Sequence, residues 1–177
     1  MRTIILCVVL FIAGCGGPKV AVRYEARRAL LAQRRYAIEP VRFESMRVGR
    51  VAAAQWIARK SEAQRQRWAA DQRLLSDTFA AHVAARVPIA DGAGALIIRP
   101  IVDELEPGYY AYVASGRTHM VLRVQIIEPL SNQVVEELEL RDAVNAHAWS
   151  AAAGPRMARA AANLGDRLGD FLRARSR

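Results

Sequence analysis

The chain has 177 residues, of which 53% are hydrophobic, and its formal net charge is +9. That hydrophobic fraction excludes a disordered chain, and the length suits a single domain with one core. The basic balance alone would suit nucleic acid, but the sequence contains no zinc-finger, helix-turn-helix or RNA-binding motif.

The amino terminus joins a positive start to a short apolar run. Arg2 supplies the charge, and the run from Thr3 to Ala13 is too short to span a bilayer of about 30 Å. The run ends in Ile12-Ala13-Gly14-Cys15, which resembles the lipobox of bacterial lipoprotein signal peptides. The resemblance implies that residues 1–14 are a signal peptide, cleaved between Gly14 and Cys15, and that Cys15 carries the lipid, palmitate included.

A lipid anchor on Cys15 is consistent with the other cysteine. Cys7 lies in the run that would be removed, so Cys15 has no disulfide partner in the processed chain. Each buried methylene contributes about 0.8 kcal/mol, so several acyl chains make a durable anchor. By resemblance to the sorting rule of enteric bacteria, Gly16 after the cysteine favours the periplasmic side of the outer membrane over the inner membrane. The alternatives are an ordinary secretory signal, or a membrane anchor with a chance cysteine.

Charge is distributed unevenly along the chain. Residues 19–73 hold 14 Lys or Arg and 5 Asp or Glu, residues 74–142 hold 5 and 10, and residues 143–177 hold 6 and 2. A basic segment near a lipid anchor would attract anionic head groups or, equally, an acidic partner. A protein exported to the envelope meets little nucleic acid, so we expect no nucleic-acid partner.

Residues 15–35 are expected to form a lipidated, basic tether. Gly and Pro oppose regular structure in residues 16–23, and residues 24–35 suit a linker, or else a basic amphipathic helix lying on a surface. A single α/β domain is then expected over residues 36–174.

This domain is predicted to begin with a strand and a long helix. The strand, Tyr36 to Phe43, changes phase at Pro40, which indicates an edge strand or a bulge. The helix should begin at Ser61 and run to about residue 87, because Pro88 stops it. One stripe of side chains recurs at helical spacing and predicts a core face, with a partner groove as the alternative: Trp68, Leu75, Phe79, Val83 and Arg86.

Three strands are predicted next, over residues 95–105, 119–128 and 134–142. The last two alternate apolar and polar side chains and turn at residues 131–133, so they predict an antiparallel hairpin with one solvated face. We expect Arg123 to pair across strands with a glutamate.

The connection over residues 106–118 carries three tyrosines: Tyr109, Tyr110 and Tyr112. Exposed aromatic side chains on a loop can anchor a partner, so these are candidate partner contacts. The alternative is that they extend the flanking strands.

A last helix is predicted from Pro155. Its apolar face is Met157, Ala161, Leu164, Leu168, Phe171 and Leu172. Gly165 and Gly169, four residues apart, predict that this helix lies closely on a sheet.

The sequence shows no catalytic motif. The three histidines, His82, His119 and His147, lie on different elements without metal-ligand spacing. Three carboxylates cluster before Pro107: Asp103, Glu104 and Glu106. Paired carboxylates can do acid–base work, but charged residues near a strand end are usually solvated. We therefore expect no enzyme activity, no cofactor and no metal.

The predicted order of elements over residues 36–174 resembles Gram-negative envelope lipoproteins with a domain like the TolB N-terminal domain, as in the CsgG and LpoB lipoproteins. The carriers are Tyr36 to Pro40, the helix with Trp68 and Phe79, Ile101 to Gly108, and Met120 to Leu140. The resemblance implies an α/β two-layer sandwich, with a small mixed or antiparallel sheet and two helices on one face. It also implies a binding or assembly role.

Two functions follow from these observations. The first is a lipid-anchored periplasmic lipoprotein that binds an unidentified envelope protein within a complex, through the open sheet face, its edge or the loop over residues 106–118. The alternative is an auxiliary lipoprotein of an ABC-type lipid or solute transport system. The sequence specifies neither the partner nor the oligomeric state.

Overall fold

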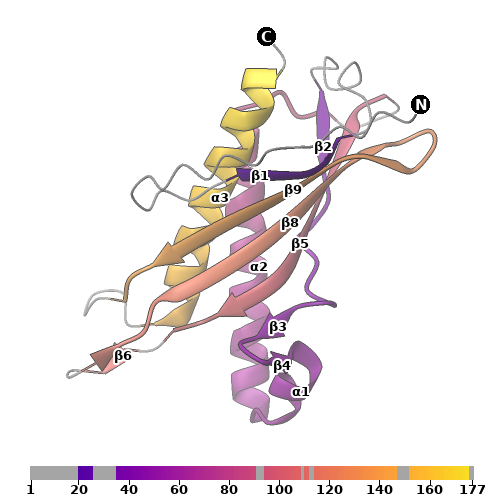
Figure 1. Ribbon diagram of the computed structural model, residues 1–177. Helices are drawn as coiled ribbons and strands as arrows, with labels where there is room; N and C mark the ends of the chain where they lie inside the picture. Colours follow the sequence, from indigo (N-terminus) through magenta and orange to yellow (C-terminus); the bar gives the residue numbers. More distant parts are fainter. Residues whose placement is uncertain are drawn as a thin grey trace, which may run out of the picture.

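The computed structural model describes residues 20–25, 35–90, 94–108, 110–111, 114–146 and 152–175. This part of the chain forms two layers, a mixed sheet and two long helices, α2 (Glu62–Ala84) and α3 (Ala153–Arg175). Both helices cover the same face of the sheet (Figure 1). The predicted two-layer α/β sandwich is therefore confirmed.

The described sheet has seven strands, six of them in the order β1-β9-β8-β5-β3-β4. Three long antiparallel strands form its centre: β9 (Gln133–Val144), β8 (Thr118–Glu128) and β5 (Leu96–Glu106). Of the short strands, β2 (Tyr36–Ile38) and β3 (Arg47–Val48) pair parallel with β5, and β4 (Val51–Ala52) pairs with β3. A separate hairpin, β6 (Tyr110–Ala111) and β7 (Ala114–Ser115), lies between β5 and β8.

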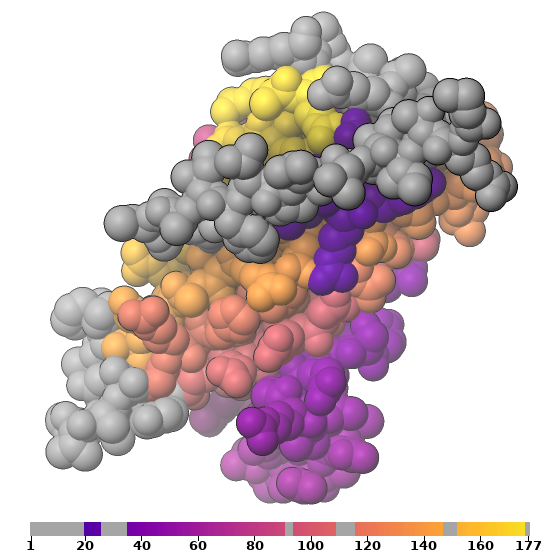
Figure 2. Space-filling view, in the orientation of Figure 1, coloured from indigo at the N-terminus to yellow at the C-terminus, as the bar shows by residue number. Residues whose placement is uncertain are grey.

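Strands β8 and β9 form the predicted hairpin. Met120, Leu122, Val124 and Ile126 are buried, whereas Arg123 and Gln125 point to the other face and are partly exposed. Asn132, at φ 53°, supplies the left-handed residue of the turn, a conformation that Asn tolerates. In Figure 2, the strands of residues 96–144 occupy the middle of this other face, and none of the described helices lies over them.

Helix α2 follows the short helix α1 (Ala53–Ala58) and begins with a capping box. The backbone N–H of Gln64 donates to Ser61 Oγ at 3.3 Å, and the backbone N–H of Ser61 donates to Gln64 Oε1 at 3.0 Å. The predicted core face of this helix is buried, with Phe79 and Val83 fully inaccessible, except at Arg86, which lies beyond the helix, is partly exposed and pairs with Asp166. This confirms the stripe, although the helix ends at Ala84, three residues earlier than predicted.

Helix α3 contacts α2 as well as the sheet. Its predicted apolar face is buried, apart from Phe171, which is half-buried. A β-carbon at Gly165 would lie 2.8 Å from the carbonyl oxygen of Phe79 and 2.9 Å from the β-carbon of His82. Gly165 and Gly169 both face α2. The prediction that these glycines allow α3 to approach the sheet closely was therefore wrong, since they allow it to approach α2.

Two predictions near the start of the chain also need correction. Val20–Glu25, inside the predicted tether, is the edge strand β1 and pairs antiparallel with β9, where it satisfies backbone groups that an open edge would leave unpaired. The predicted strand from Tyr36 to Phe43 is interrupted, since β2 ends at Ile38. Pro40 has no N–H to donate, and bonding to β5 resumes at Arg42, whose backbone N–H donates to the carbonyl oxygen of Pro100 and whose carbonyl accepts from the N–H of Val102.

Candidate partner-binding site

A buried arginine fixes both ends of the connection over residues 106–118. Arg156, in the first turn of α3, is 1% exposed. Its Nη2 donates to the carbonyl oxygen of Pro107 at 2.8 Å, and its Nε donates to Thr118 Oγ1 at 2.9 Å. The Thr118 hydroxyl in turn donates to the same Pro107 carbonyl at 2.7 Å. Desolvation lowers the pKa of this guanidinium, but an arginine keeps its charge in proteins, so the hydrogen bonds stabilise a buried cation.

Gly108 continues this turn in a conformation that only glycine adopts easily. Its φ is 67°, and a β-carbon there would lie 2.7 Å from the carbonyl oxygen of Gly116. The two ends of the connection therefore approach backbone to backbone.

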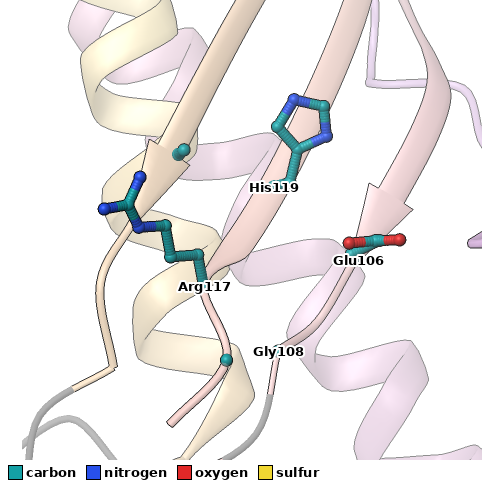
Figure 3. Close-up of a pocket in the computed structure, with 6 residues that line it drawn as sticks. Glu106, Gly108, Arg117 and His119 are labelled. Carbon is teal, nitrogen blue, oxygen red and sulfur yellow. The ribbon is translucent and has the colours of Figure 1, made fainter. Parts of the chain in front are cut away.

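An open groove, the strand-end groove, lies beside this turn, with a volume of about 640 Å³. It is lined by Glu106, Gly108, Gly116, Arg117, His119 and Ala143. Figure 3 shows Glu106, Arg117 and His119 around it, at the ends of β5 and β8. Glu106 and His119 are partners in the register of the two strands. The groove thus presents a carboxylate, a guanidinium and an imidazole.

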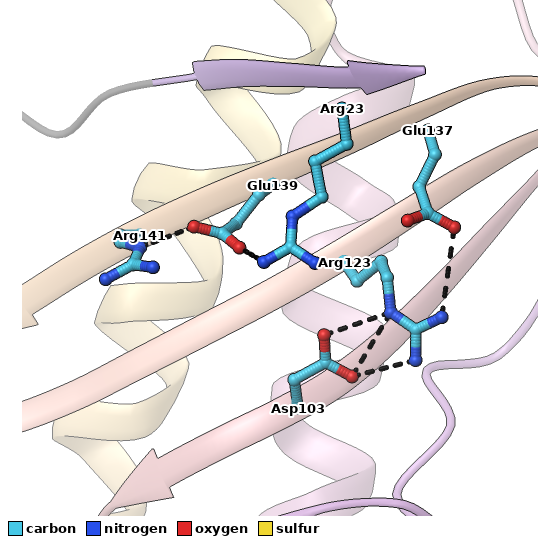
Figure 4. A network of polar contacts seen from close by, with 6 residues as sticks. All are labelled: Arg23, Asp103, Arg123, Glu137, Glu139 and Arg141. Atoms are coloured by element: carbon cyan, nitrogen blue, oxygen red, sulfur yellow. Dashed lines mark hydrogen bonds and ion pairs between the residues drawn. The ribbon is translucent and has the colours of Figure 1, made fainter.

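Charged side chains on the uncovered sheet face bind one another (Figure 4). Arg123 grips Asp103 with two nitrogens, Nε at 3.0 Å from Oδ2 and Nη2 at 2.9 Å from Oδ1, which raises the pKa of the guanidinium. Its Nη1 lies 3.8 Å from Glu137 Oε2, so the expected cross-strand glutamate is present but is the second partner. Glu139 pairs with both Arg23 and Arg141.

The predicted site residues are only partly described. Gly14, Cys15, Tyr109 and Tyr112 lie outside the described residues. The backbone of Tyr110 belongs to β6, opposite Ser115 of β7, next to the strand-end groove. The anchor and the tyrosine contacts stay predictions.

The candidate chemical groups do not converge. His82 Nδ1 lies 3.1 Å from Asp166 Oδ1, His119 lines the strand-end groove, and His147 lies outside the described residues. Among the described residues, no three His, Cys, Asp or Glu side chains could share a metal ion. No described helix is long and apolar enough to cross a membrane.

No known protein family matches the sequence, and no curated protein matches it. The fold resembles that of protein XCC0632 from Xanthomonas campestris, which is assigned to the DUF330 family. That match has a TM-score of 0.50 and 12% identity, and covers 88% of this chain and 93% of the other. At such identity the likeness concerns the fold alone.

Two more distant structures also align. One is a candidate lipoprotein of Caulobacter crescentus CB15, with a TM-score of 0.43, 14% identity and coverage of 83% of this chain and 92% of that one. The other is the PelC dodecamer from Paraburkholderia phytofirmans, with a TM-score of 0.36, 13% identity and coverage of 84% and 98%. The likeness to the TolB N-terminal domain stays a prediction.

Sequence reasoning missed Arg156, although a signal was present. Arg156 precedes Ala160 by four residues and Leu164 by eight, so it lies on the apolar stripe of α3. A cation on such a stripe indicates a buried charge with specific acceptors.

Proposed function

We propose that this chain is a lipoprotein, anchored through Cys15 on the periplasmic side of the outer membrane, that binds another protein of an envelope complex. The finer resemblance to TolB N-terminal-like domains belongs to the same proposal. The observation that carries the binding role is the clamp of Arg156 on Pro107 and Thr118 beside the strand-end groove. It ties down the rim of an open groove that carries the charged side chains Glu106 and Arg117.

A fixed rim favours binding because association costs less when the contact surface is already ordered. The backbone at Gly108 and the buried hydrogen bonds of Arg156 set the positions of Glu106 and Arg117 before any partner arrives. On the uncovered sheet face, the pairs Arg123–Asp103 and Arg141–Glu139 likewise hold their side chains in place. We propose binding rather than catalysis, because the residues that line the groove offer charged contacts and include no Ser, Thr, Cys or Lys that could act as a nucleophile.

The anchor is tested by Cys15→Ser. Metabolic labelling with a palmitate analogue should mark the wild-type chain and not the variant, and the variant should leave the membrane fraction. Retention of Cys15→Ser in membranes, unlabelled, would refute the anchor.

The binding surface is tested by photo-crosslinking in cells. A photoreactive residue at Arg117, on the rim of the groove, should give a discrete adduct with another envelope protein. The same residue at Leu74, exposed on α2, is the matched control. An adduct pattern that is the same at both positions would remove the support for this surface.

The alternative, an auxiliary lipoprotein of an ABC-type transport system, requires an apolar groove between the helices and the sheet. In the described residues, Leu138, Leu164 and Leu168 fill that interface and are fully inaccessible to solvent. No observation favours this alternative, and retention of lipid in native mass spectrometry would revive it.

A further inference from the structure

A second hollow, the aromatic cleft, also touches the turn at Pro107. Its volume is about 200 Å³, and its other principal walls are Trp56, Lys60, Gln64, Arg67, Trp68 and Asp71. These side chains come from α1, from the turn after it and from the first turns of α2. Both helices project past the long strands at one end of the molecule (Figure 1) and form a knob in the space-filling view (Figure 2).

Two indole rings form the aromatic part of the cleft. The centroids of Trp56 and Trp68 are 4.9 Å apart, with the ring planes inclined at 59°. The ammonium of Lys60 lies 4.2 Å from the centroid of Trp56. Trp56 is half-buried, so part of this aromatic surface faces solvent. Tryptophan and arginine in such settings are the residues that most often dominate binding energy at protein interfaces.

The size of the cleft limits what it can hold. Pockets that enclose small organic ligands measure about 300–1,000 Å³, and this cleft is smaller and open. It therefore suits one side chain that projects from a larger partner.

The charges around the cleft favour an acidic partner. Lys60 and Arg67 make no ion pair within 4 Å in the described part of the chain, whereas Arg65 is paired with Glu62 at 2.7 Å. Residues 44–73, which include α1 and the first turns of α2, hold seven Lys or Arg and three Asp or Glu. Such a surface attracts carboxylates and speeds their encounter.

Asp71 adds one acceptor inside the cleft. Burial raises the pKa of this carboxyl, and the charge of Arg67 opposes that shift. No hydrogen bond to Asp71 occurs within the described residues. Its oxygens can therefore accept a hydrogen bond from the O–H of an aromatic side chain that enters the cleft.

We propose that the aromatic cleft binds an acidic segment of a partner protein, with a tyrosine side chain of that segment against Trp56 and Trp68. Carboxylates beside the tyrosine meet Lys60 and Arg67, and the tyrosine hydroxyl donates to Asp71. This inference rests on the proposed binding function and adds the chemistry of the partner.

The test is calorimetric titration of the full-length protein, in detergent, with a seven-residue peptide that has one tyrosine between two runs of three glutamates. We expect the tyrosine peptide to bind about tenfold more tightly than its alanine version, with the phenylalanine version between them. Asp71→Ala should abolish the preference for tyrosine over phenylalanine.

Charge reversal separates this cleft from general attraction. Lys60→Glu and Arg67→Glu should each weaken the peptide by about tenfold. Arg73→Glu is the matched control, because Arg73 is exposed on the same helix but does not line the cleft. Equal weakening by Arg73→Glu, or no binding of the tyrosine peptide, would overturn the proposal.

Analytical ultracentrifugation tests the other possible occupant of the cleft, a second copy of this chain. A change of oligomeric state in Lys60→Glu, without an effect on the peptide, would show that the cleft is a contact between copies. If the peptide does not bind, the results of the Cys15 and Arg117 experiments still stand. The proposed cleft partner and the proposed function can therefore be refuted independently.

Discussion

Arg156 Nη2 donates to the carbonyl oxygen of Pro107 at 2.8 Å, which joins residues 49 positions apart in the sequence. The same guanidinium reaches Thr118, so one side chain on α3 connects the end of β5 with the start of β8. The strand-end groove and the aromatic cleft both include residues of the turn that this contact holds, Gly108 in one and Pro107 in the other.

Replacement of this arginine should destabilise the fold. Arg156→Met keeps an unbranched apolar stem but leaves the Pro107 carbonyl with one donor fewer and Thr118 Oγ1 without the Nε–H donor. We expect a loss of about 1–3 kcal/mol for each buried group left without its partner. Chemical denaturation measures this loss. Arg159→Met, an exposed position on the same helix, should change stability by less than about 0.5 kcal/mol.

Gly165→Ala tests the close approach of α3 to α2. In a helix with free space, this change would stabilise the protein by about 0.5–1 kcal/mol. Here the new methyl group would meet the carbonyl oxygen of Phe79 at 2.8 Å, which is backbone and cannot turn away. We expect a lower melting temperature, and a raised one would contradict the packing described.

Glu136 predicts an unusual dependence of stability on pH. Its side chain is inaccessible to solvent, and neither carboxylate oxygen has a hydrogen bond within the described residues. Burial raises the pKa of this carboxyl, while the charge of Arg175 opposes the shift and that of Glu25 adds to it. The folded state thus holds the proton more tightly than the unfolded state.

The sign follows from that difference. The contribution of Glu136 to stability is complete below its unfolded pKa of about 4.3 and is lost as the pH rises through the higher folded value. Glu136→Gln mimics the protonated form, so it should be more stable than the wild type at pH 7, with the gap closing toward pH 4. Thermal unfolding across this range measures it, with Glu44→Gln at the surface as control. A gap that widens in acid would disprove the assignment.

Arg175 should control how firmly β1 is attached. Its Nη1 lies 2.6 Å from Glu25 Oε1 on β1, and its Nη2 lies 3.3 Å from Glu136 Oε1 on β9. Five of the six β1 residues are exposed, so apolar burial contributes little to its attachment. Arg175→Ala should therefore lower the free energy of opening of β1 by about 1 kcal/mol. The amides of β1 should then exchange their hydrogens about fivefold faster.

Strand β8 is the internal control for β1. The amides of β8, in the centre of the sheet, should exchange at an unchanged rate in Arg175→Ala. Arg65→Ala, which removes an exposed ion pair on α2, should leave β1 unchanged as well. Equal acceleration in β1 and β8 would mean that the whole fold, not the edge strand, had been weakened.

Local pattern was enough to predict the long elements. The stripe from Trp68 to Val83 and the alternation from Met120 to Ile126 each repeat with the period of one element, so burial of one face follows directly. The helix start at Ser61 and the stop near Pro88 are equally local. Pro40 marked the irregularity in the first strand in the same local way. The strand β1 could not be found like this, because it depends on what the distant strand β9 offers as a hydrogen-bond partner.

The sequence by itself determined the long central strands and helices and the expectation of an anchor at Cys15, because these depend on periodicity and on a motif of adjacent residues. The two-layer class was implied by the resemblance that the order of these elements carries. Only the tertiary structure decided that Gly165 faces α2, that Arg156 clamps Pro107 and Thr118, and that Trp56 meets Trp68 beside Lys60. Each of these contacts joins separate elements, and the energy of a buried hydrogen bond or a close helix approach depends on distances that no local pattern carries.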